Sequence, residues 1–184
     1  MPAPQRVTHE EIVSAARAIV ERDGVEQLTM RALADALGVK PPSLYKRLRD
    51  RRDVIRLVAE DGIAQLTNAL NAIAPTPSQA PDRLRSIARA VREFGLEHPG
   101  TYALIFDPRI SGEIEPAGLR SAVQPVLDVL ASEGHDDPLS GARVLTAWLH
   151  GFVSMEVAGA FRFGGSTEVA FEDGLGCILR ALDV

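Results

Sequence analysis

The stretch Thr29–Arg52, TMRALADALGVKPPSLYKRLRDRR, decides the fold. Its hydrophobic spacing predicts two short helices joined by a tight turn, followed at once by the start of a third helix. Thr29 can cap the first helix, and Gly38 suits a turn position with a positive φ. Pro41 and Pro42 can open the second helix, where a missing N–H costs nothing. The stretch therefore predicts a helix-turn-helix whose second helix is the candidate reader of a DNA major groove.

Positive charge is concentrated in the same part of the chain. Residues 40–56 carry seven Lys and Arg side chains against two Asp side chains, and both lysines of the chain, Lys40 and Lys46, lie there. Residues 57–184 carry 9 cationic against 17 anionic side chains, and the whole chain has a formal net charge of −5. A basic N-terminal region (the head) followed by an acidic remainder of the chain is typical of a protein that contacts a phosphate backbone through the head only.

Composition indicates a globular, all-α protein. The 184 residues are 46 % hydrophobic and 24 % charged, and no stretch shows the period-two alternation of a strand. The single cysteine excludes an intramolecular disulfide framework and a cysteine-rich metal site, so we expect no metal and no cofactor. No stretch approaches the roughly 18 apolar residues of a membrane span, and no signal core is present at the N-terminus. We therefore expect a cytoplasmic protein with no membrane partner.

Helix start and stop signals along the chain predict about nine helices. Thr8 and Glu11 have the spacing of a capping box, and Gly24 can close that first helix. Asp50 is a good N-cap for the fourth helix. A polar, proline-rich loop is expected over residues 74–81. Further helices are expected over residues 82–98, 101–106, 116–132, 139–161 and 168–182.

Residues from about 8 to 60 resemble the DNA-binding domain of the TetR family of transcriptional regulators. The residues that carry the resemblance are Leu33-Ala34, Leu37-Gly38-Val39, Ser43-Leu44-Tyr45, Arg51 and Val54-Ile55. Leu48 stands where the family usually has Phe or Val, and Arg51 stands where it usually has Lys. The later chain resembles the C-terminal domain type named for its Trp-His-Gly signature, here Trp148, His150 and Gly151.

The resemblance implies a DNA-binding domain over residues 1–52 and a helical ligand-binding and dimerisation domain over residues 53–184. It implies a homodimeric regulator, more commonly a repressor, that binds a palindromic double-stranded DNA operator. It also implies that a small hydrophobic effector of unknown identity releases the operator by changing the spacing of the two heads.

Three sets of site residues follow. The DNA-binding candidates, from the resemblance and from their place in the reading helix, are Thr29, Lys40, Pro41, Pro42, Ser43, Tyr45, Lys46, Arg47 and Arg51. The ligand-binding candidates are the large side chains of the later helices and one histidine, namely Phe94, Tyr102, Phe106, Trp148, His150, Phe152 and Met155. The dimer-interface candidates are Leu145, Leu149, Phe171, Leu175, Ile178, Leu179 and Leu182.

Alternative interpretations accompany these sets. Each large ligand-binding candidate could be ordinary core, and His150 could be a hydrogen-bonded core histidine. The last helix, which carries most of the dimer candidates, could instead dock on the core of its own monomer. Regulation could act without a small-molecule effector. An enzyme could be built only from His150, Ser154 and Glu156, or from Cys177, and no nucleophile elbow, phosphate loop or metal-ligand spacing accompanies them. We therefore expect no catalytic residues.

Overall fold

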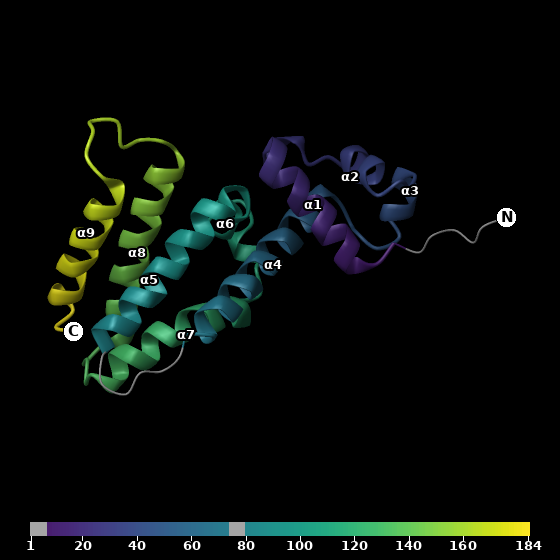
Figure 1. The fold of residues 1–184 in the computed structure, drawn as a ribbon. Coiled ribbons are helices and arrows are strands. Elements are labelled where there is room, and N and C mark those ends of the chain that lie inside the picture. The colour runs from purple at the N-terminus through teal and green to yellow at the C-terminus, as the bar shows by residue number, and fades with distance from the viewer. Residues whose placement is uncertain (1–6, 74–79) are drawn as a thin grey trace. The chain divides into compact units, whose positions relative to one another are not determined.

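The protein is helical throughout the part that the structure describes. A computed structural model describes residues 7–73 and 80–184, apart from the side chain of Ser111. This part holds nine α-helices and two short 3-10 helices, and it contains no strand (Figure 1). In chain order these are α1 (His9–Asp23), η1 (Val25–Gln27), α2 (Met30–Ala36), α3 (Pro41–Leu44), α4 (Arg51–Asn71), α5 (Ala80–Glu97), α6 (Pro99–Ile105), η2 (Ser111–Glu113), α7 (Pro116–Ser132), α8 (Pro138–Val157) and α9 (Thr167–Ala181).

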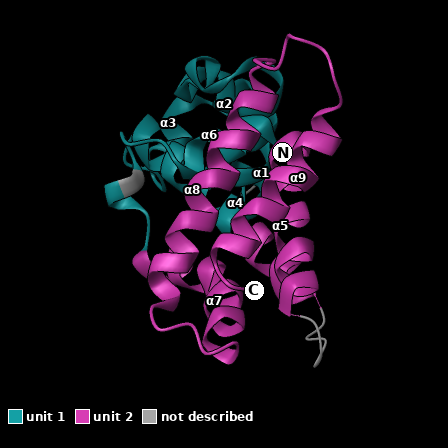
Figure 2. Ribbon diagram, turned by 90° about the vertical axis from the view of Figure 1, so that its left-hand side faces the viewer, with its two compact units in different colours: residues 1–63, 98–115 teal, residues 64–97, 116–184 magenta. Residues whose placement is uncertain are grey.

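These helices belong to two compact units, coloured separately in Figure 2. Unit 1 joins Met1–Ile63 with His98–Glu115, and unit 2 joins Ala64–Glu97 with Pro116–Val184. The helix-turn-helix therefore shares its unit with α6 and the segment that follows it. The functional boundary between residues 52 and 53 stays a prediction, since α4 continues unbroken through that position.

The capping signals in the sequence are confirmed in unit 1. The Thr8 hydroxyl accepts from the Glu11 amide and the Glu11 carboxylate accepts from the Thr8 amide, which completes the capping box of α1. Thr29 caps α2 by accepting from the Ala32 amide. Gly38 has a φ of +65°, and the Val39 amide donates to the Ala34 carbonyl, so the turn after α2 closes as the glycine predicts.

Unit 2 is built around the packing of α5 against α7, α8 and α9. Leu84 and Ile87 of α5 are buried, as are Leu145 and Leu149 of α8. An ion pair also joins these helices, because the Arg92 guanidinium of α5 donates two 2.8 Å bonds to the Glu156 carboxylate of α8. Arg92 also bonds to Glu168 of α9 and lies over the Phe171 ring. Burial of apolar side chains and the ionic contacts of Arg92 together hold α5, α8 and α9 against one another.

Several helix ends differ from the prediction. The reading helix was expected to continue through Arg47, but α3 ends at Leu44 and a turn follows. Helix α8 ends at Val157, before the expected residue 161. Most of the loop expected over residues 74–81 lies outside the described residues. Among the helices that are described, none combines the length and the apolar character needed to cross a bilayer.

Candidate nucleic-acid interface

The reading helix α3 and the turn after it are held by leucines on one side and expose polar residues on the other. Leu44 and Leu48 are almost fully buried, four residues apart on the inner side. Lys46 and Arg47 are exposed, and the Tyr45 side chain is 55 % exposed. Pro42 and Ser43 are exposed within α3. The leucines thus anchor the segment and leave its hydroxyls and cations free to meet a ligand.

The cations of this surface lack acidic partners. Lys40, Lys46 and Arg47 form no ion pair with any described residue. By contrast, Arg51 pairs with Glu26, and Arg52 pairs with Glu113. Unpaired exposed cations create the positive potential that a phosphate backbone requires. The surface of residues 40–47 therefore suits a polyanion better than the first turn of α4 does.

Two predicted DNA contacts have intramolecular roles. The Thr29 hydroxyl accepts from the Ala32 amide, although its own hydrogen remains able to donate. Arg51 turns its guanidinium toward the connection between α1 and α2, where it donates to the carbonyls of Leu28 and Val25. The Arg51 guanidinium, which was expected to bind a phosphate, is therefore bonded to these backbone carbonyls.

The predicted pocket residues fall into two groups. In unit 1, Tyr102 of α6 packs against Phe106, the residue that follows the helix, with ring centroids 5.2 Å apart and ring planes tilted by 54°. Burial raises the pKa of the Tyr102 hydroxyl. In unit 2, Trp148 and Phe152 pack together with Phe171.

The remaining candidates lie in unit 2. Phe94 of α5 is buried, and Met155 of α8 is exposed. His150 is half-buried with its Nδ1 3.3 Å from the Ser154 hydroxyl, and burial lowers the pKa of its imidazole. The Glu156 carboxylate, which the enzyme alternative would use, is taken up by Arg92 instead.

The predicted dimer residues lie mostly inside the protomer. Leu145, Leu149, Phe171, Leu175, Leu179 and Leu182 are all nearly inaccessible, and only Ile178 is partly exposed. They pack within the group formed by α5, α7, α8 and α9. In this protomer they leave little area for a partner to cover, and their assignment to a dimer interface stays a prediction.

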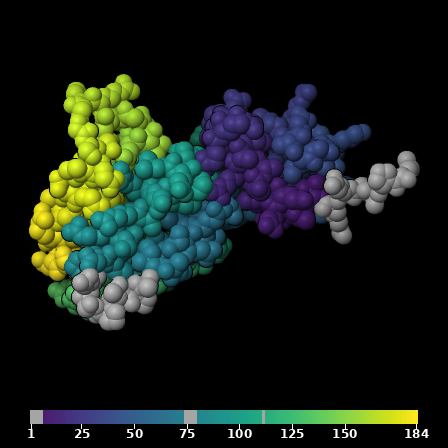
Figure 3. Space-filling model, viewed as in Figure 1, coloured from purple at the N-terminus to yellow at the C-terminus, as the bar shows by residue number. Residues whose placement is uncertain are grey.

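A different face of α8 is exposed and apolar. Val144, Ala147, Gly151 and Met155 recur every three or four residues along it and are all accessible. The position that a Cβ on Gly151 would take has no heavy atom within 4 Å. The connection from α8 to α9 stands out from unit 2 (Figure 3), and its Phe163 is fully exposed. The spacing of these α8 residues was a signal in the sequence that the prediction did not use.

Residues that follow α6 were also missed by the prediction. Asp107, Arg109 and Ile110 line a hollow of about 460 Å³ together with Arg51, Arg52, Val25 and Ile55. Arg52 donates to the Arg109 carbonyl at 2.6 Å and pairs with Glu113 at 2.8 Å. These partners are separated by more than 50 positions, and no local pattern in the sequence points to them.

Comparisons with known proteins agree with this geometry. The profile of bacterial regulatory proteins of the tetR family matches residues 12–58, and a tetracyclin repressor-like C-terminal domain profile matches residues 84–178. An uncharacterized HTH-type transcriptional regulator of Mycobacterium tuberculosis is 34 % identical over 164 residues, which span 85 % of this chain and 73 % of that protein.

Solved structures show the same fold. The TetR family protein ActR of Streptomyces coelicolor, in complex with (S)-DNPA, has a TM-score of 0.78 at 20 % identity, covering 97 % of this chain and 98 % of ActR. BioQ with its natural double-stranded DNA operator has a TM-score of 0.73 at 23 % identity, covering 96 % of this chain and 98 % of BioQ. The profile matches, the relative and the exposed reading helix lead to one conclusion: the chain belongs to the TetR family of helix-turn-helix transcriptional regulators.

Proposed function

We propose that the protein is a cytoplasmic, homodimeric repressor that binds a palindromic operator and is released by a small hydrophobic effector. The observation that carries this proposal is the exposed surface of residues 40–47, with three unpaired cations over a buried leucine anchor. Two such surfaces, related by a two-fold axis, suit two half-sites about one helical turn apart, ~34 Å, or a multiple of that distance.

Each exposed residue has a role that its chemistry supports. Lys46 and Arg47 reach phosphates or guanine edges, and the hydroxyls of Ser43 and Tyr45 donate to phosphates. Pro42 can touch a thymine methyl group. Pro41 opens the reading helix. Lys40 and Thr29 precede it in the chain, where Lys40 adds charge and the Thr29 hydroxyl can donate. Arg51 takes part through the backbone carbonyls that it holds.

The dimer forms through the exposed face of α8. Val144, Ala147, Gly151 and Met155 present an apolar surface, and the open space at Gly151 allows a helix of the second copy to approach closely. Glycine inside an exposed helix costs about 1 kcal/mol relative to alanine. A close helix contact is a physical reason for glycine at this position.

The effector is bound by the aromatic residues of the later helices. ActR in its complex with (S)-DNPA shares the fold, which makes a small-molecule site in a protein of this architecture reasonable. Phe94, Trp148 and Phe152, which all lie in unit 2, are the proposed contacts. Binding shifts the population toward a spacing of heads that does not fit the operator.

Operator binding is tested by titrating the purified protein against its own upstream intergenic DNA over a salt series. Specific and steeply salt-dependent binding is expected. The Tyr45→Ala variant should lose operator binding while its melting temperature stays close to wild type, because the side chain is half-exposed. Unchanged affinity in this variant would contradict the role of the reading helix.

The effector is tested separately by thermal shift against a library of small hydrophobic compounds. A ligand that prefers the native state must raise the melting temperature, and it should also release the operator. If no compound does so while operator binding is intact, the protein is a regulator without a small-molecule effector.

A further inference from the structure

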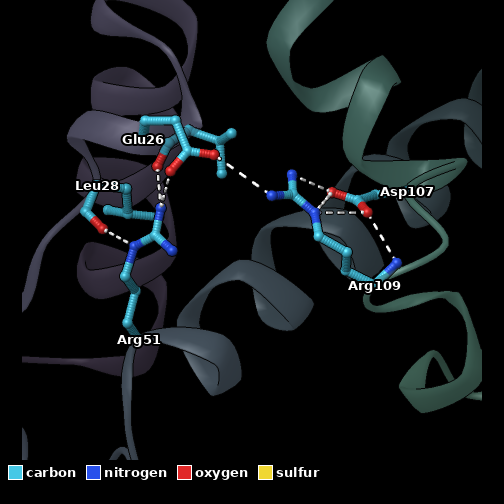
Figure 4. Close-up of polar contacts among 6 residues, drawn as sticks. Glu26, Leu28, Arg51, Asp107 and Arg109 are labelled. Carbon is cyan, nitrogen blue, oxygen red and sulfur yellow. Dashed lines mark hydrogen bonds and ion pairs between the residues drawn. The ribbon is translucent and has the colours of Figure 1, made fainter.

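Arg51 opens α4 but points back toward the connection between α1 and α2. Its Nε donates to the Leu28 carbonyl and its Nη2 donates to the Val25 carbonyl, each at 2.6 Å (Figure 4). Leu28 is buried and directly precedes Thr29, the N-cap of α2. The guanidinium therefore fixes the backbone just before α2, where the helix-turn-helix begins.

Glu26 in the same connection is shared between two arginines. Its carboxylate lies 3.5 Å from Arg51 Nη2 and 3.4 Å from Arg109 Nη1. Arg109, which follows α6, is itself held by bonds to Asp107. A continuous series, Asp107–Arg109–Glu26–Arg51, thus joins the end of α6 to the start of α4 within unit 1 (Figure 4).

We infer that Arg51 is a positioning residue for operator binding and that Arg109 supports it through Glu26. Arg51 acts by holding the carbonyls that precede α2, which orients α2 and α3, and it does not contact a phosphate. The inference rests on the proposed function, because it names how the same DNA surface is held in place. It also makes residues 107–109, outside the helix-turn-helix, a determinant of operator affinity.

Geometry and burial decide the relative importance of these contacts. The Arg51 side chain is 38 % exposed and its bonds to the two carbonyls are short and charge-assisted, so they are the strong interactions of the series. Glu26 and Arg109 are 70 % and 65 % exposed, and exposed ion pairs contribute little. Loss of Arg51 should therefore weaken operator binding much more than loss of Arg109 or Glu26.

Salt dependence separates a positioning residue from a phosphate contact. Because log K falls as log salt rises, each phosphate contact that is lost makes this negative slope less steep by about 0.9. We expect Arg51→Gln to bind the operator about tenfold more weakly at every salt concentration with the wild-type slope. Lys46→Gln, the matched control at a proposed phosphate contact, should make the slope less steep. A slope that becomes less steep in Arg51→Gln, as it does in Lys46→Gln, overturns the inference.

Arg51→Lys tests geometry against charge. Lysine keeps the charge but lacks the planar fork that reaches two carbonyls from fixed positions. We expect only partial recovery of affinity, together with faster hydrogen exchange at the Ala32 and Leu33 amides at the start of α2. Wild-type affinity and wild-type exchange in Arg51→Lys would show that charge alone suffices, which contradicts the inference.

The outer part of the series is tested by a double-mutant cycle on the surface residues, whose loss leaves the core intact. Arg109→Gln and Glu26→Gln should each weaken operator binding about two- to fivefold at low salt with an unchanged slope. The double variant should lose no more than the larger single loss, whereas additive losses would show that the two residues act independently. Failure of the wild-type protein to bind its operator would instead refute the proposed function. In that case, hydrogen exchange at the Ala32 amide in Arg51→Gln would still test whether Arg51 stabilises the start of α2.

Discussion

Gly174 of α9 allows a close contact with the Trp148 indole of α8. A Cβ at this position would lie 2.7 Å from Cζ2 of Trp148, closer than such atoms approach each other. Trp148 of α8 therefore rests directly on the backbone of α9. The sequence shows a glycine inside a helix, which suggests close packing, but the structure shows that the neighbour is an indole of the same chain.

We predict that Gly174→Ala destabilises the protein although alanine favours the helix. The indole must shift away from its place beside Phe152 and Phe171, and overpacking of this kind costs about 1–3 kcal/mol. Gly176→Ala in the same helix is the matched control, because its Cβ would meet only arginine ends at 3.4 and 3.8 Å. Urea unfolding should show a loss of stability for Gly174→Ala alone, and equal stability of the two variants would refute the explanation.

At the scale of elements, the contact between α1 and α6 replaces a missing cap. The N-cap residue His98 makes no side-chain capping bond, and the Glu21 carboxylate of α1 accepts from the Gly100 and Thr101 amides at 2.9 Å each. Gly100 allows this approach, since a Cβ there would lie 2.8 Å from Val20 Cγ1. Helix α6 is therefore seated on α1 by a negative charge at its N-terminus.

Glu21→Ala should destabilise the contact between α1 and α6 by about 1–2 kcal/mol, as loss of a capping acceptor does. Hydrogen exchange at the Gly100 and Thr101 amides should accelerate, because both donors lose their partner. Glu21→Gln keeps one carbonyl oxygen and should fall between wild type and Glu21→Ala. Unchanged exchange at both amides in Glu21→Ala would mean that packing alone holds α6.

The pair Arg92 and Glu156 predicts a pH dependence of unit 2. Hydrogen bonds from Arg92 hold the pKa of the Glu156 carboxyl below its usual value of 4.5. The stabilising contribution is therefore complete above that value and is lost as the pH falls through the lower pKa of the folded state. We expect Glu156→Gln to be less stable than wild type at neutral pH, with the difference shrinking in acid. Glu97→Gln, at an exposed carboxylate of α5, is the control, and a difference that persists in acid would contradict the assignment.

At the scale of the whole molecule, the sequence predicted the elements better than their partners. Local signals such as the Thr8 and Glu11 box, Gly38 and Asp50 depend on neighbours in the chain, and the structure confirms their caps and turn. The role of Arg51 depends on carbonyls 23 and 26 positions away, which no local pattern encodes. The leucine stripe of α8 predicted an apolar contact face, and Leu145 and Leu149 are buried in the protomer. Periodicity alone does not say whether a helix packs such a stripe in its own protomer or against a partner.

The last prediction concerns the assembly and uses the open space at Gly151. In Gly151→Arg the new side chain meets no atom within 4 Å of its Cβ in the protomer, so the fold and its melting temperature should be preserved. If two copies meet through this face of α8, the arginine must be buried against its counterpart, and the dimer should weaken at least tenfold. Sedimentation should then show monomers, and operator affinity should fall because the two heads are no longer linked. Ala131→Arg on the exposed side of α7 is the control, and a Gly151→Arg protein that remains dimeric would place the interface elsewhere.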